Sequence, residues 1–158
     1  MELEVAKAQE VKSFSETEFA EKYLVTEPYA TKIRITHITP CSFKSNEQYT
    51  IFPSPHLIIK SAVQKWNLYP EKYSVNDEEA IEQLIENTRI QSYNLRSTRY
   101  HVKGAVIPSF IGDTTITVRG PEPLLQLINL LMMFLEFSGL GMKTSLGMGG
   151  CKIERISR

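Results

Sequence analysis

Five of the eight glycines of this 158-residue chain lie between residues 139 and 150, around one cation, Lys143. Glycine allows a positive φ and lets a ligand approach the main chain closely. Backbone N–H groups beside a lysine suit the binding of phosphate. The segment therefore predicts a loop that binds phosphate or a nucleic-acid backbone. Its candidate contact residues are Gly139, Gly141, Lys143, Thr144, Ser145, Gly147 and Gly149.

A second candidate site is a run of basic and aromatic residues earlier in the chain. Arg96, Arg99 and Lys103 alternate with Tyr93 and Tyr100. Cations pair with phosphates and tyrosine rings stack on unpaired bases, so this mixture favours single-stranded RNA. An ordinary solvated strand face is the alternative. Lys44 is a further, weaker candidate.

The three histidines are the candidates for proton transfer. His101 lies beside Arg99, Tyr100 and Lys103, and nearby cations favour its neutral form, so it is the candidate general base. His37 and His56 are expected to be structural. Neither they nor the two cysteines, Cys41 and Cys151, form a cluster with metal-ligand spacing, so no metal or cofactor is expected.

The charge of the chain is unevenly distributed, although its formal net charge is zero. Residues 1–30 carry 3 basic and 7 acidic side chains, residues 31–88 carry 6 and 7, and residues 89–158 carry 9 and 4. The positive region coincides with both candidate sites, which suits an anionic partner. The acidic N-terminus is unlike a signal peptide, and the apolar stretch 124–137 is too short to span a bilayer. We expect a soluble, cytoplasmic protein with no membrane partner.

The elements around the glycine-rich loop exclude two nucleotide-binding motifs. Pro121 marks the start of a helix and Gly139 its end, and apolar and polar residues alternate over residues 151–156 as in a strand. The loop therefore leads from a helix to a strand. Dinucleotide fingerprints and P-loops have the opposite order, in which phosphate meets a helix N-terminus.

The remaining elements complete an α+β pattern. Ser15 and Glu18 form a capping box at the start of a short helix, helices follow Pro55 and Asn76, and Pro40 should end the first strand. The order predicts a ferredoxin-like βαββαβ domain with one extra helix. We assign residues 1–29 to an N-terminal extension and residues 30–158 to this domain. The expected strands are 30–38, 90–102, 105–118 (broken by Pro108 and Gly112) and 151–156.

Several segments together resemble one family, the CRISPR repeat-processing endoribonucleases of the repeat-associated mysterious protein superfamily. The closest resemblance is the glycine-rich segment Phe137–Gly150. Three further segments resemble the family's motifs, although Pro108 and Ser109 replace the usual first glycine of the last: Thr39–Phe43, Phe52–Asn67 and Ile107–Gly112.

The resemblance implies that the intact protein is an enzyme that cleaves repeat RNA without metal. The 2′-hydroxyl attacks the adjacent phosphate and leaves a 2′,3′-cyclic phosphate. Such proteins usually carry two ferredoxin-like domains, with the catalytic histidine on the first, and this chain resembles only the second. The implied partners are repeat RNA, a missing or separate N-terminal domain, and a CRISPR effector complex or a second copy. The alternatives are a non-catalytic RNA-binding subunit and a ferredoxin-like domain that binds a small anion.

Overall fold

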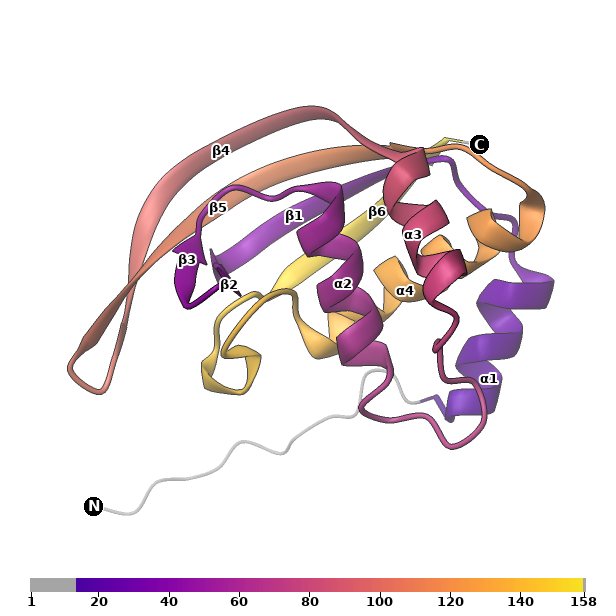
Figure 1. Cartoon of the computed structure of the whole chain (residues 1–158), viewed down its shortest axis with the longest axis horizontal. Coiled ribbons are helices and arrows are strands. Elements are labelled where there is room, and N and C mark those ends of the chain that lie inside the picture. Colours follow the sequence, from indigo (N-terminus) through magenta and orange to yellow (C-terminus); the bar gives the residue numbers. More distant parts are fainter. Residues whose placement is uncertain (1–13, 158) are drawn as a thin grey trace, which may run out of the picture.

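Four antiparallel strands form the central sheet, in the order β4-β5-β1-β6. A computed structural model describes residues 14–157. Figure 1 shows the helices gathered on one side of this sheet. The strand order and the two main helices confirm the predicted ferredoxin-like fold. The main elements are β1 (Lys32–Cys41), α2 (Pro55–Trp66), β4 (Thr88–Val102), β5 (Ala105–Val118), α4 (Glu122–Ser138) and β6 (Cys151–Ser157).

Shorter helices and strands accompany the central sheet and its two main helices. The N-terminal helix α1 continues into a π-helical turn, η1, and β2 and β3 form a small hairpin. The extra helix, α3, precedes β4. Within residues 14–157, no helix is long and apolar enough to cross a membrane. The shorter elements have the bounds α1 (Glu16–Glu21), η1 (Lys22–Thr26), β2 (Phe43–Ser45), β3 (Gln48–Thr50), α3 (Glu78–Asn87) and the 3-10 turn η2 (Thr144–Leu146).

The hydrophobic core lies between the sheet and helices α2 and α4. Apolar side chains recur at helical spacing on both helices and at alternate positions on the strands, which is why one face of each element is buried. Trp66 packs in this core. Its fully buried members include Ile33, Ile35, Ile58, Ile59, Ile116, Ile128, Leu131 and Met132.

Two strands run through residues that were expected to end or break them. β1 continues past Pro40 to Cys41, across an irregularity in its register between His37 and Cys41. β5 is continuous through Pro108 and Gly112. Pro108 pairs with β4 alone, because the register with β1 begins further along, at Phe110, and proline is tolerated where one edge of a strand is free.

The helix starts follow local side-chain chemistry. The Ser15 capping box is present as predicted, with the Phe14 and Phe19 rings 6.3 Å apart. Helix α3 begins one residue later than predicted. The N-cap is Asp77 and not Asn76, because the Asp77 side chain accepts a hydrogen bond from the Ala80 amide. Both residues are common caps, so the sequence did not distinguish them.

The N-terminal helix is fastened to the body of the molecule by one carboxylate. The Glu16 oxygens accept hydrogen bonds from the amides of Glu71 (2.8 Å), Lys72 (3.1 Å) and Tyr73 (2.8 Å). These bonds, that of Glu71 above all, hold the pKa of Glu16 below its ordinary value of 4.5. The ionised form is therefore the one that the fold stabilises.

We expect Glu16→Gln to lower the melting temperature at neutral pH, because a glutamine offers one acceptor oxygen and no charge. A lowered pKa in the folded state contributes stability above the unfolded value, and this contribution disappears as the pH falls through the folded value. The difference in melting temperature between Glu16→Gln and the parent should therefore shrink as the pH falls below about 4.5. Glu21→Gln, on the same helix and without a hydrogen bond among the described residues, is the control. A difference that is constant with pH would contradict the assignment.

Candidate nucleic-acid interface

Most amides of the glycine-rich loop are committed to holding its shape. The amide of Gly139 donates to Leu135 O (2.8 Å), that of Gly141 to Ser61 Oγ (2.9 Å) and that of Gly149 to Pro40 O (2.9 Å). The Gly147 amide closes the turn η2 within the loop. The N–H groups of these four glycines are therefore not free donors, and the contact of these glycines with RNA stays a prediction that their amides do not support.

The glycines are needed because the backbone passes too close to other backbone. A Cβ on Gly149 would lie 2.0 Å from Leu140 O, and one on Gly141 would lie 2.4 Å from Ser42 O. Both residues also have positive φ, +74° and +84°. The glycine pattern thus encodes a compact loop that is packed against the end of β1.

The tip of the loop retains donors for a ligand. Among residues 14–157, no acceptor meets the amides of Lys143, Thr144 and Ser145. Lys143 adopts a left-handed conformation, is exposed and forms no ion pair in the described chain. Three consecutive amides beside a cation could bind one phosphate. The prediction for Lys143, Thr144 and Ser145 therefore retains its physical basis.

Helix α2 supports the tip through two residues that sequence reasoning missed. Ser61 and Lys65 lie one turn apart, so they share a helix face. Ser61 accepts the Gly141 amide, and Lys65 Nζ donates to Thr144 Oγ1 at 2.8 Å. The available signal was the helical spacing of these two polar residues, but the helix also carries the polar residues His56, Lys60 and Gln64. Which surface they would meet depends on the tertiary fold.

The long hairpin of β4 and β5 reaches the same loop. The Tyr100 hydroxyl donates to Leu146 O, and a Cβ on Gly147 would lie 2.8 Å from that hydroxyl. The structure therefore brings the predicted basic strand and the predicted loop together. Arg96, Arg99 and Lys103 are exposed on this hairpin, and within the described residues none of them pairs with a carboxylate.

Two other basic residues near these elements already have an acidic partner. Lys44 pairs with Glu47 at 3.4 Å, and on the sheet Arg34 pairs with Glu154 at 3.1 Å. The cations without partners at the hairpin and the loop thus form a distinct group, which we call the basic surface. It comprises Lys65, Arg96, Arg99, Lys103 and Lys143.

An exposed aromatic pair lies on the same hairpin. Tyr93 of β4 meets Phe52, which precedes α2, with ring centroids 5.1 Å apart and perpendicular planes. Tyr93 is 59% exposed and Phe52 is 48% exposed. Large aromatic surfaces left in water are available for base stacking. Phe52 was not predicted, because only the fold brings it to Tyr93.

The histidines occupy different environments. His101 and His56 are exposed. His37 is buried, its Nε2 lies 3.1 Å from Thr114 Oγ1, and its Nδ1 has no hydrogen-bond partner among the described residues. Burial lowers the pKa of His37 to about 4, despite the opposing field of Asp113. His37 is thus a neutral core residue at physiological pH, although it is less fully hydrogen-bonded than expected.

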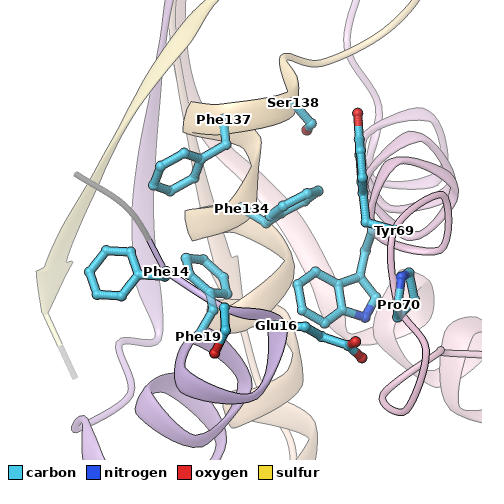
Figure 2. A pocket seen from close by; sticks show the side chains of 10 residues that line it. Phe14, Glu16, Phe19, Tyr69, Pro70, Phe134, Phe137 and Ser138 are labelled. Carbon is cyan, nitrogen blue, oxygen red and sulfur yellow. The ribbon is translucent and has the colours of Figure 1, made fainter. Parts of the chain in front are cut away.

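A separate pocket of about 440 Å³ opens on the helical side of the molecule. Figure 2 shows Phe14, Phe19, Phe134 and Phe137 along its wall, with Tyr69 opposite. Among the described residues that line it, Glu16 alone is charged, and its carboxylate already accepts hydrogen bonds from three amides. The pocket is therefore apolar and lacks the cations of the basic surface.

Comparison with known proteins identifies the family of the chain. Residues 35–151 match the family of CRISPR-associated endoribonuclease Cas6. Over 129 residues the chain is 40% identical to a Cas6 of Streptococcus thermophilus, an alignment that covers 82% of this chain and 53% of that protein. The chain thus spans about half the length of this curated relative.

Solved structures give the same result. Thermus thermophilus Cas6 superimposes with a TM-score of 0.78 at 26% identity, over 89% of this chain and 58% of the other. A Cas6 product complex superimposes with a TM-score of 0.75 at 25% identity, over 85% and 55% of the two chains.

Proposed function

Because the chain belongs to the Cas6 family of CRISPR-associated endoribonucleases, we propose that it binds precursor CRISPR repeat RNA as the C-terminal half of such an enzyme. The observation that carries this proposal is the basic surface. Lys65 and Lys143 lie at the free amides of the loop tip, and the hairpin that carries the other cations contacts the same loop through Tyr100. Phosphates would bind Lys143 and its neighbouring amides, while Arg96 and Arg99 would bind the backbone further along the strand.

The expected reaction needs groups that the basic surface only partly supplies. A base must take the 2′-hydroxyl proton, an acid must protonate the leaving 5′-oxygen, and donors must stabilise the charged phosphorane. Cations and amides of the basic surface suit the last role. The exposed His101 is the candidate base within the chain, whereas the family resemblance places the catalytic histidine in a preceding domain. We therefore propose that a preceding or separate ferredoxin-like domain provides the base.

A non-catalytic RNA-binding subunit of a CRISPR complex is the second candidate. It uses the same surface for the same ligand and differs only in the absence of cleavage. The RNA-binding function is thus common to both candidates, and a cleavage assay separates them.

The cleavage assay compares repeat RNA with the same RNA carrying a 2′-deoxy nucleotide at the scission site, both in EDTA. We expect the chain alone to bind both RNAs and cleave neither. Joined to the N-terminal half of a relative, it should cleave only the all-ribose RNA and leave a 2′,3′-cyclic phosphate. Cleavage by the chain alone would contradict the division of labour between the halves. The absence of RNA binding at low salt would overturn the proposal itself.

We expect Lys143→Ala to weaken repeat-RNA binding about tenfold, which corresponds to about 1.4 kcal/mol. The loss should be similar for unrelated single-stranded RNAs, because the contact is to phosphate and not to a base. Lys60→Ala removes a lysine that Glu78 and Glu82 already neutralise, and it is the control. Affinity can be measured by fluorescence anisotropy. Equal effects of the two substitutions would show that the loop tip is not a phosphate contact.

A further inference from the structure

Lys65 is a cation in an unfavourable position for a purely structural lysine. It is partly buried at the end of α2, and burial lowers its pKa below the ordinary value of 10.5. Among residues 14–157, no carboxylate pairs with it. Removing an ammonium group from water without a compensating anion costs stability. In the described chain Lys65 has a hydrogen bond to the neutral Thr144 hydroxyl but no anion to offset this cost.

The surroundings of Lys65 indicate what would compensate its charge. Its Nζ is held 2.8 Å from Thr144 Oγ1. The amide of Thr144 and the amides on either side of it have no acceptor in the described chain. An ammonium group and three N–H donors thus lie at or next to a single residue, and within residues 14–157 the Thr144 hydroxyl is the one acceptor of the lysine side chain.

We propose that Lys65 is a phosphate-binding residue of this interface, positioned by Thr144 to meet the same phosphate as the loop tip. The inference rests on the proposed RNA-binding function and assigns it a residue outside the glycine-rich loop. α2 is anchored by Trp66 in the core, and Ser61 on the same helix also holds the loop through Gly141. Lys65 is therefore fixed relative to the loop tip before RNA arrives.

The test is Lys65→Met, which keeps most of the apolar stem and removes the charge. Each lost phosphate contact lowers the slope of log affinity against log salt concentration by about 0.7 for single strands. We expect that decrease, with about tenfold weaker binding of repeat RNA at moderate salt. We also expect the melting temperature of the free variant to equal or exceed that of the parent. Lys60→Met, on the same helix, is the matched control, since Glu78 and Glu82 already neutralise Lys60.

These readouts distinguish the possible failures. A lower melting temperature with an unchanged salt slope would show that Lys65 only supports Thr144, and would overturn the proposal. Lys65→Arg should restore the slope, since it retains the charge. If the parent protein does not bind repeat RNA, the proposed function fails. If the parent binds and Lys65→Met matches it in slope and affinity, only the role of Lys65 is refuted.

Discussion

Replacing Gly149 by alanine is expected to destabilise the protein by about 3 kcal/mol or more and to weaken RNA binding at least tenfold. Two costs add. The first is conformational, because a non-glycine residue in the left-handed region lowers the free energy of unfolding by about 1 kcal/mol. The second is steric, because the new Cβ would lie 2.0 Å from Leu140 O. Because this contact is with backbone, the loop must move, and the Lys143 tip must move with it. Thermal unfolding and RNA titration measure the two effects.

Gly104 provides the matched control. Its φ of +81° is close to the +74° of Gly149, but a Cβ there would meet no atom within 4 Å. Gly104→Ala should therefore show the conformational cost alone, about 1 kcal/mol. If the two variants unfold within about 0.5 kcal/mol of each other, the close approach at Gly149 is not a constraint on the loop.

Phe19→Ala should be the most damaging substitution in the N-terminal helix. The Phe19 ring lies within 6.3 Å, centroid to centroid, of five other aromatic rings, including Trp66 on α2 and Phe134 on α4. It is 6% exposed. Removing a buried phenyl ring costs about 3–5 kcal/mol, which for a chain of this size lowers the melting temperature by about 10 °C.

Val25→Ala is the control, because Val25 is 76% exposed and its loss should cost less than about 0.5 kcal/mol. The same contacts bear on the proposed division at residues 29 and 30. We expect a fragment of residues 30–158 to be folded but less stable than the chain by at least the Phe19→Ala loss. An equally stable fragment would show that α1 adds nothing to the domain.

The parts of the fold that the sequence predicted are those set by local chemistry. The capping box at Ser15, the apolar face of α2 and the proline and glycine around α4 each act within a few residues, so their pattern is visible without the fold. Proline and glycine inside strands were less informative. Pro40 lies at an irregularity of β1, and Gly112 is required because Asn94 O approaches to within 2.0 Å of where a Cβ would lie.

The sequence indicates which residues of the candidate site are exposed, but not which of their polar groups are free. Lys143 and the hairpin cations have the expected exposure, but the loop glycines use their amides internally. Lys65 could not be predicted, because its role depends on contact with Thr144, 79 residues further along the chain. Side chains from separate elements become a site only once the sheet and helices have set their distance.

The internal hydrogen bonds of the glycine-rich loop have a consequence for binding kinetics. A loop that is already held at Pro40, Ser61 and Tyr100 loses little conformational entropy when a ligand arrives. Association should then be set by electrostatic attraction and be similar for many RNAs. Discrimination among them would arise in how long each complex survives, so stopped-flow dissociation rates should rank RNAs more clearly than their association rates.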